Sequence, residues 1–295
     1  MTRRALVTGV TGFIGGELAK RLLADGWHVD GIVRPQSDTQ DLANVAGLTL
    51  HVIQDSQDLT PLLAATSPDV VFHLASLYLA EHRPDQIGML VQSNLLFTAL
   101  LAEAMAATGT RNLINTGTAW QNFETNNYRP VNLYAATKQA AEDLLLYYAD
   151  ARNLSVITLR LFDTYGHTDK RRKLIQILID AARNGESLDM SPGDQIVDMT
   201  HVDDVVAGFI LAAQQLLGTR FGKPKAYYLS GERHSVKALA RLVSDVLNHP
   251  IEIRFGGRAY RAREVMGPIV PSSDATLPGW TRKQSLQSYL AAFVA

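Results

Sequence analysis

Cysteine is absent from this chain of 295 residues. Its absence excludes disulfide bonds, thiolate metal sites and cysteine nucleophiles, and it agrees with a reducing compartment. Long apolar runs are missing as well, so the sequence predicts no membrane-spanning helix. The chain also has almost no net charge, because its 28 Lys and Arg residues nearly balance its 29 Asp and Glu residues and leave a formal charge of −1. Such a balance gives no general attraction for nucleic acid or for an anionic membrane.

Other functional signatures are also lacking. No histidine pair has zinc-like spacing, so no metal site is expected, and no Gly-x-Ser-x-Gly elbow indicates a hydrolase. Arg3 and Arg4 precede an apolar stretch, but glycines and threonines interrupt it and no cleavage site follows, which argues against a secretory signal. With 46% apolar residues available for a core, we expect a soluble cytoplasmic protein.

Short apolar runs rich in β-branched residues alternate with longer helical patterns along the chain. Repeated βα units of this length predict an α/β fold, with a doubly wound parallel sheet covered by helices on both faces. The predicted strands are residues 5–9, 28–34, 49–54, 69–76, 112–118, 155–162 and 225–231. The predicted helices are residues 12–26, 89–107, 134–151, 169–185, 201–217 and 235–247.

A glycine-rich stretch, GVTGFIG, joins the first predicted strand to the first predicted helix. The first glycine allows a tight turn, the second lets a pyrophosphate approach the backbone, and the third lets helix and strand pack closely. The helix N-terminus then offers its free N–H groups to the phosphates. An ordinary glycine-rich turn is the alternative, but the strand–turn–helix setting favours a Rossmann dinucleotide site. The residues predicted to bind here are Gly9, Thr11, Gly12, Phe13, Ile14 and Gly15.

Arg34 closes the second predicted strand, where an NAD site carries an acidic residue that accepts hydrogen bonds from the ribose 2′-OH. Val33 is not acidic, and Asp30 comes too early in the strand. Because an arginine can clamp a 2′-phosphate, we favour NADPH/NADP over NAD, with a solvated surface arginine as the alternative. Further cofactor candidates follow other strands, although all could be ordinary loop residues: Asp55, Ser56, Leu74, Ala75, Ser76 and Leu161.

One tyrosine is followed by a lysine four residues later, Tyr134 and Lys138. On a helix this spacing places both side chains on one face, one turn apart. A nearby ammonium would lower the tyrosine pKa from about 10 and make Tyr134 a general acid or base. The hydroxyl of Thr118, at the end of the fifth strand, could share a substrate oxygen with Tyr134.

These motifs are similar to those of the extended short-chain dehydrogenases/reductases, the NAD-dependent epimerase/dehydratase superfamily. The matching pieces run in the family's order: the glycine turn, DVVFHLAS, NTGTAW, YAATK, LRLFDTYG, HVDDVV, GGRAYRAREVM and PGW. The resemblance implies Thr118, Tyr134 and Lys138 as the catalytic set, with Lys138 also holding the nicotinamide ribose and Asn94 in support. It implies a Rossmann domain of residues 1–166, to which 201–234 return, and a smaller, mainly C-terminal nucleotide-sugar-binding lobe of 167–200 and 235–295.

Three chemistries compete within the superfamily. A 4,6-dehydratase needs an acidic pair just after the catalytic threonine, where this chain has Ala119 and Trp120. NAD-dependent epimerases usually carry the acidic residue that Arg34 replaces. The segments TGTAWQNF, PVNLYAATKQA and LFDTYG resemble CDP-abequose synthase-type 4-ketoreductases. We therefore expect NADPH-dependent reduction of a nucleotide-diphospho-4-keto-6-deoxy sugar, with an NAD-dependent epimerase and a non-catalytic NADP(H)-sensing regulator as alternatives.

The expected substrate is a diphosphate and needs cations. Arg172 and Lys173 belong to one basic cluster with Arg171, for which a solvated helix start is the alternative. Arg258, Tyr260, Arg261 and Arg263 form the other, after two glycines. Asp163 stands where the wider family has asparagine, which leaves its sugar contact in doubt.

The resemblance also implies a homodimer, in which helices 89–107 and 134–151 pair with a second copy. Such an interface needs apolar side chains beyond those that pack on the sheet. Burial in the monomer core explains the candidates nearly as well: Leu95, Leu96, Leu100, Leu144 and Leu145.

Overall fold

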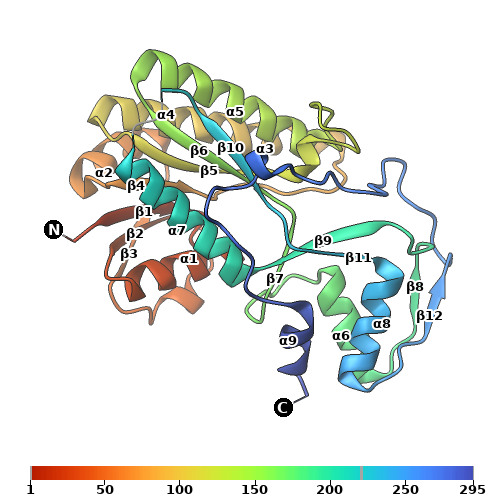
Figure 1. Ribbon diagram of the computed structural model, residues 1–295. Coiled ribbons are helices and arrows are strands. Elements are labelled where there is room, and N and C mark those ends of the chain that lie inside the picture. The colour runs from red at the N-terminus through yellow and green to blue at the C-terminus, as the bar shows by residue number, and fades with distance from the viewer. Residues whose placement is uncertain (1, 220–221, 295) are drawn as a thin grey trace.

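A seven-stranded parallel sheet organises the chain, with strand order β10-β6-β5-β4-β1-β2-β3. The computed structural model describes residues 2–219 and 222–294, without the side chain of Ser56. Figure 1 shows the sheet beside a smaller lobe that holds the C-terminus. The strands are β1 (Arg4–Thr8), β2 (His28–Val33), β3 (Leu48–Val52), β4 (Val70–His73), β5 (Asn112–Thr118), β6 (Ser155–Leu161) and β10 (Lys225–Leu229). The predicted α/β class and doubly wound parallel sheet are confirmed.

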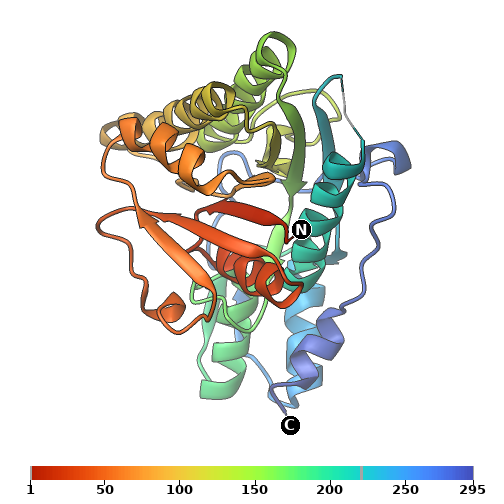
Figure 2. The same ribbon diagram turned by 90° about the vertical axis from the view of Figure 1, so that its left-hand side faces the viewer.

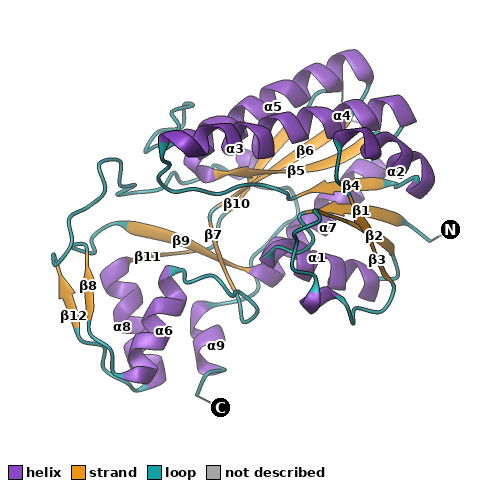
Figure 3. Ribbon diagram, turned by 180° about the vertical axis from the view of Figure 1, so that it is seen from behind, coloured by secondary structure: helices purple, strands orange, loops and turns teal. Residues whose placement is uncertain are grey.

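Helices cover both faces of this sheet, as the views from the side and from behind show (Figures 2 and 3). One layer holds α1 (Phe13–Ala24) and α7 (Val202–Gly218), which pack on each other. The other holds α2 (Leu59–Thr66), α4 (Phe97–Thr108) and α5 (Leu133–Arg152). Because both faces are covered, an inner strand such as β4 is buried along its whole length and reads as a continuous apolar run.

The smaller lobe combines two short sheets with three helices. In the three-stranded sheet, β9 (Ile196–His201) lies between β7 (Asp163–Tyr165) and β11 (Glu232–Ser235). The two-stranded sheet pairs β8 (Leu188–Met190) with β12 (Ile253–Phe255). The helices are α6 (Leu174–Asn184), α8 (Val236–Leu247) and α9 (Leu286–Ala291), and they share an apolar core of their own.

Several features of this lobe differ from the sequence-based expectation, which did not include its short strands or α9. The predicted helix 169–185 begins only at Leu174, so its basic residues precede the helix instead of heading it. Lys173 has extended backbone at the N-cap, which frees this cluster to turn toward the large sheet. The strand β9 was not predicted, because its polar Asp198 and Thr200 interrupt the apolar pattern; both are buried within the small sheet.

The strand order reverses between β1 and β4, the neighbours at the centre of the large sheet. Ligands of open α/β sheets bind in the crevice outside the carboxyl ends of the strands at such a switch point. There the turn after β1 meets the loop after β4. The fold thus brings the glycine turn and Leu74–Ser76, 60 residues apart in sequence, to one crevice.

A helical stretch, Pro84–Thr108, joins α3 (Ile87–Val91), the π-helical segment Gln92–Leu96 and α4. Its length and composition would allow it to cross a membrane, with a mean hydropathy of 1.4 in its most apolar window. However, a core helix of a soluble protein can have the same length and composition, so one such helix is weak evidence for a membrane span. A third of its most apolar window is buried within the fold. The stretch packs in the helix layer on the sheet, in contact with α2 and α5.

Candidate active site

The glycine turn has the geometry that its spacing predicts. Gly9 has φ +71°, and a Cβ there would lie 2.6 Å from the backbone nitrogen of Ala75. A Cβ on Gly15 would lie 2.2 Å from the carbonyl oxygen of Gly9, so only glycine lets α1 pack this close to the turn. The N–H of Gly12 donates to the Gly9 carbonyl at 2.9 Å, and Gly12 is the N-cap of α1. Thr11 and Gly12 are exposed, so the start of α1 is open to a phosphate.

Arg34 follows β2 at the edge of the same crevice. Its backbone N–H donates to the Ser37 hydroxyl at 3.0 Å, while its exposed guanidinium makes no hydrogen bond or ion pair within the described part of the chain. Asp55 lies after β3, and its carboxylate accepts from the Gln57 N–H at 3.1 Å. The side chain of Ser56 lies outside the described residues. Leu161 is buried at the end of β6, where it pairs with Thr118.

Asn94 lies in the π-helical segment and fixes the loop after β4. Its side chain exchanges two hydrogen bonds with the backbone of Leu77, at 2.7 and 2.9 Å. It also accepts from the Ser76 hydroxyl at 3.1 Å and donates to the Thr137 hydroxyl of α5 at 3.1 Å. Single π-helical turns often occur at functional sites, and this one aims a buried amide at the loop and at α5 together.

Tyr134 and Lys138 lie one turn apart near the start of α5, as predicted. The N-cap residue, Asn132, accepts from the Ala135 N–H at 2.9 Å and donates to the Ala80 carbonyl at 2.9 Å. These bonds tie the beginning of α5 to the loop after β4. The two predicted halves of the site, cofactor crevice and Tyr–Lys helix, therefore meet at this loop.

The pKa of Tyr134 is raised to about 12, chiefly because the phenol is buried. A hydrogen bond with Ser76 and the charge of Arg171 act in the opposite direction. Burial outweighs the effects of Ser76 and Arg171, so the net shift of this pKa is upward, and the predicted influence of Lys138 on it stays a prediction. At neutral pH the Tyr134 phenol carries its proton.

Lys138 is 2% exposed, and burial lowers the pKa of its ammonium to about 8, with Glu142 acting to raise it. His73, at the end of β4, is fully enclosed beside it. Burial, followed by the charge of Lys138, lowers the pKa of His73 to about 3. Its ring contacts the hydroxyls of Thr8 and Thr98 at 2.8 and 2.9 Å, so the neutral imidazole is held from both sides.

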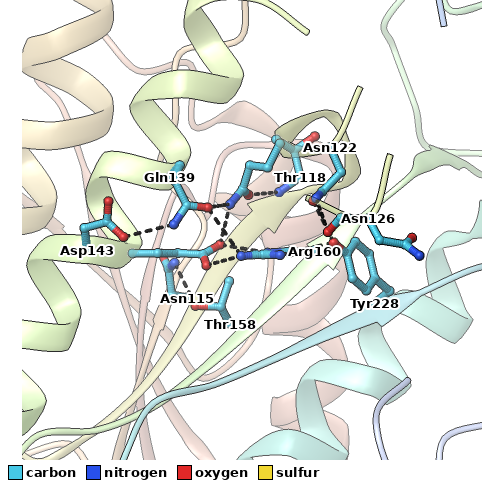
Figure 4. A network of polar contacts seen from close by, with 11 residues as sticks. Asn115, Thr118, Asn122, Asn126, Gln139, Asp143, Thr158, Arg160 and Tyr228 are labelled. Carbon is cyan, nitrogen blue, oxygen red and sulfur yellow. Dashed lines mark hydrogen bonds and ion pairs between the residues drawn. The ribbon is translucent and has the colours of Figure 1, made fainter. Parts of the chain in front are cut away.

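Thr118 ends β5, and its hydroxyl oxygen accepts from the Trp120 N–H at 3.2 Å. The hydroxyl proton is thus free to be donated to a ligand oxygen. Its backbone N–H donates to Gln121, at 2.9 Å, which is part of a polar network beneath the site (Figure 4). Sequence reasoning identified Thr118 but not this network.

A cavity of about 1100 Å³ opens between the large sheet and the smaller lobe. Tyr78 and Trp120 line it as an aromatic wall, with their ring centroids 5.7 Å apart. The Tyr78 ring also meets the Tyr134 ring edge to face, at 5.1 Å, so the wall adjoins the predicted Tyr–Lys pair. The Lys173 ammonium lies 4.4 Å from the Tyr78 centroid. Tyr78 was not predicted, since nothing in its local sequence marks it.

Asp163, in the cavity wall, is surrounded by cations. Burial raises the pKa of its carboxyl, whereas Lys173, Arg171 and Arg261 each lower it. The pKa of Lys173 is lowered by its own burial and raised by Asp163. The cations predicted for a diphosphate thus gather around one buried carboxyl, and Arg172 lines the same cavity.

The second predicted basic cluster divides. Arg258, Arg261 and Arg263 line the cavity, whereas Tyr260 does not. The Tyr260 hydroxyl instead accepts from the Asp194 N–H at 3.1 Å. Arg263 donates to the carbonyls of Val131 and Pro130, at 2.8 and 2.7 Å, so its guanidinium clasps the loop before α5.

Comparison with known proteins places these features in a family. The sequence model of the NAD dependent epimerase/dehydratase family matches residues 5–223. CDP-abequose synthase of Yersinia pseudotuberculosis is 26% identical over 266 residues, covering 90% of this chain and 91% of that protein. UDP-glucose 4-epimerase of Mycolicibacterium smegmatis is 28% identical over 300 residues, covering 90% and 92%. The solved structure of MoeE5 in complex with UDP-glucuronic acid and NAD has a TM-score of 0.83 at 27% identity, and the match covers 98% of this chain and 96% of that one.

Proposed function

The chain belongs to the NAD-dependent epimerase/dehydratase family and is an enzyme of the extended short-chain dehydrogenase/reductase type, and on this premise we propose that it reduces the 4-keto group of a nucleotide-diphospho-4-keto-6-deoxy sugar with NADPH. The likeness to CDP-abequose synthase over nine-tenths of both chains supports this choice. Residues 1–166 with 201–234 would form the cofactor domain, and 167–200 with 235–295 the sugar-nucleotide lobe.

The likeness to CDP-abequose synthase, together with Arg34 where an NAD site carries an acid, is the observation that carries the proposal. Reduction of a ketone needs a proton donor at the new alkoxide, and the Tyr134 phenol is protonated at neutral pH. A tyrosine with its ordinary pKa of about 10 is also protonated there, so the choice of the reductive direction depends on the likeness and on Arg34.

The crevice after β1 fits a nicotinamide dinucleotide. A Cβ on Gly9 or Gly15 would clash with the backbone of the loop after β4 or of the turn itself, so these glycines keep the turn tight, and the open N-terminus of α1 suits a pyrophosphate. Arg34 would bind the 2′-phosphate of NADP(H), because its guanidinium is exposed and unpaired among the described residues. When bound, the cofactor supplies the hydride.

The chain's own residues do the rest. Tyr134 donates its phenolic proton to the oxygen of the reduced carbonyl, while the Thr118 hydroxyl donates a hydrogen bond to the same oxygen. Lys138, by the family resemblance, holds the nicotinamide ribose and supplies positive charge to the developing phenolate. Arg172, Lys173, Arg258 and Arg261 line the cavity where the substrate diphosphate would lie.

We also propose a cytoplasmic homodimer that pairs α4 and α5 with a second copy. Leu96, Leu146 and Tyr147 support this interface, with 48%, 52% and 56% of their surfaces exposed. Leu145 does not, because it is 1% exposed within the core of the large sheet. Light scattering at micromolar concentration tests the state, and a monomer would contradict it.

Stoichiometry separates the reductase from its rivals. Incubation of a 4-keto-6-deoxy sugar nucleotide with NADPH should consume one NADPH for each sugar reduced, measured by absorbance and mass spectrometry. The second candidate is an epimerase, which the likeness to UDP-glucose 4-epimerase supports. It would be established if the protein interconverted UDP-glucose and UDP-galactose with its cofactor retained and with no net loss of NADPH. NADPH binding with neither reaction would indicate a regulator.

The cofactor choice is tested at Arg34. NADPH should bind the wild type more tightly than NADH, and Arg34→Ala should weaken NADPH binding while leaving NADH nearly unchanged. Arg21→Ala, which removes an exposed arginine on α1 with its own partner Asp25, is the matched control. Equal affinities for both cofactors in the wild type would remove the argument for NADPH.

A further inference from the structure

We propose that Glu142 is a positioning residue of this enzyme: through Gln121 it fixes the backbone of Thr118, and from one turn along α5 its charge acts on the ammonium of Lys138. The inference rests on the proposed function, because it takes Thr118, Tyr134 and Lys138 as the catalytic set. Glu142 itself lies outside the cavity lining, so it acts only through other residues.

Helical spacing gives the first argument. Tyr134, Lys138 and Glu142 follow one another at intervals of four residues on α5, so they form a ladder along one face. The Glu142 side chain is 12% exposed, and its charge raises the pKa of Lys138 against the effect of burial. The carboxylate thus continues, by one turn, the line that begins at the proton donor.

The carboxylate of Glu142 is held by three hydrogen bonds. Arg160, on β6, donates its Nε–H to Oε1 at 3.1 Å and its Nη2–H to Oε2 at 2.6 Å, a bidentate pair in which Arg160 is 17% exposed. Gln121 donates to Oε1 at 2.8 Å. Figure 4 shows this network on α5, β6 and the loop after β5. One strand, β6, and the turn after β5 therefore fix a charge that α5 carries.

Gln121 carries the network to the catalytic threonine. Its Oε1 accepts the Thr118 N–H at 2.9 Å, while its Nε2 donates to Glu142 and to Gln139, both at 2.8 Å. Gln121 is fully buried, so its amide has no water to rotate toward. The orientation of the Thr118 backbone depends in this way on the carboxylate.

Arg160 extends the network to the cavity wall. Its Nη1 donates to the Tyr228 hydroxyl at 3.1 Å, and that hydroxyl donates to Asn122 at 2.8 Å. Asn122 is buried and lines the cavity two residues after Trp120. The same ion pair therefore supports both the catalytic residues and the loop that carries the aromatic wall.

The other groups that face Lys138 do not replace Glu142. His73 on β4 has a pKa of about 3 and is neutral at pH 7. Tyr134, one turn before Lys138 on α5, is protonated. Arg160 on β6 is a cation that Glu142 already pairs. Glu142 is the anion that favours the charged form of Lys138.

Glu142→Gln tests the inference directly. The variant keeps the shape and one acceptor but loses the charge, so the pKa of Lys138 should fall. We would follow this pKa by NMR in protein labelled at the lysine side-chain carbon and nitrogen, with the Lys138 signal assigned by its loss in Lys138→Met. The kcat should then decline increasingly with pH, up to about ten-fold for each unit by which the pKa falls, with KM for the sugar nucleotide little changed. A purely structural role would lower kcat by one factor at every pH.

Two further variants serve as controls for this experiment. Glu17→Gln removes a carboxylate that pairs with Lys20 on the half-exposed face of α1, and it should change neither the Lys138 titration nor kcat. If Glu142→Gln fails to fold because Arg160 is left unpaired, the double variant Glu142→Gln/Arg160→Met removes both charges and should show a downward shift of Lys138 that is smaller, because loss of the cation acts in the opposite direction. A Lys138 titration that matches the wild type in the folded variant would overturn the proposal. The titration needs no substrate, so it is decided even if the wild type reduces no 4-keto sugar.

Discussion

Two parts of the candidate site differ in burial and in how many of their polar groups are already bonded. The catalytic floor, made of Thr118, Gln121, Tyr134, Lys138, Glu142 and Arg160, is largely buried, and its network residues already bond to one another. The cationic rim, made of Arg172, Lys173, Arg258 and Arg261, carries charges that make no hydrogen bond or ion pair within the described residues. The floor is organised by folding, whereas the rim cations, two of which act on the Asp163 carboxyl, keep their hydrogen-bonding groups available to an anion.

Local structure explains this contrast. The floor residues lie on β5, β6, α5 and the short turn after β5, where neighbouring elements constrain each side chain. The rim residues lie in segments without helix or strand, before α6 and after β12. Sites on rigid elements hold a geometry for chemistry, and loops suit recognition. Changes in the floor should therefore alter kcat, pKa values or stability, and changes in the rim should alter KM.

Tyr134→Phe is the strongest test of the floor. The ring and its contact with Tyr78 remain, but the proton donor is lost, so kcat should fall about 10²- to 10⁴-fold. Cofactor affinity should persist, because the glycine turn and Arg34 are untouched. Single-turnover NADPH oxidation with a 4-keto-6-deoxy sugar nucleotide measures the change, with Tyr147→Phe on the exposed side of α5 as control. Turnover at the wild-type rate with normal NADPH binding would mean that Tyr134 is not the acid.

Lys138→Met should raise the stability of the fold while it lowers the activity. The folded-state pKa of Lys138 is about 8, below the unfolded value of 10.5, so its ammonium opposes folding at pH 7 and that cost fades as pH rises from about 8 to 10.5. Replacing it by Met should stabilise the fold by about 3 kcal/mol while impairing reduction. Urea denaturation at pH 7 measures the gain. The exposed Lys20→Met should leave stability nearly unchanged, and a destabilised Lys138→Met would contradict the burial argument.

The floor also shows how far sequence reasoning reaches. The glycine turn and the Tyr134–Lys138 pair were predicted because their signals are local spacings that the fold preserves. The network of Gln121, Glu142 and Arg160 was not, because it joins residues 18 to 21 positions apart through tertiary packing. Only the spacing of four between Lys138 and Glu142 could have suggested it.

Errors at the site have the same origin. The raised pKa of Tyr134 depends on burial, which no i, i+4 spacing reports. Arg263 lines the cavity with the other cations of its cluster, yet its guanidinium already donates to backbone carbonyls of the loop before α5. Charge composition identified the cations of the smaller lobe but did not show which of them are already paired.

Acid should lower the stability of the fold through His73, which lies beside Lys138. Its folded-state pKa is about 3 against 6.5 unfolded, so the unfolded chain binds more protons and stability falls as pH drops below 6.5 toward 3. At pH 5 this group should cost about 2 kcal/mol. His73→Gln retains hydrogen-bonding groups for Thr8 and Thr98 and should lose this part of the pH dependence, measured by denaturation at pH 5 and 7. The same slope in wild type and variant would show that His73 is not the acid-sensitive group.

A substitution in the rim should have the smallest effect of those predicted here, and it should change KM instead of kcat. Arg261→Gln removes a cation that lines the cavity near Asp163, so the KM for a sugar nucleotide should rise about ten-fold while kcat stays within about two-fold. Because the rim is exposed, the difference between wild type and variant should shrink as salt is raised, whereas that of Tyr134→Phe should not. Arg183→Gln, at the far end of α6, is the control for loss of one exposed arginine. If Arg261→Gln instead lowered kcat at unchanged KM, the rim would take part in organising the floor, and the division drawn between the two would fail.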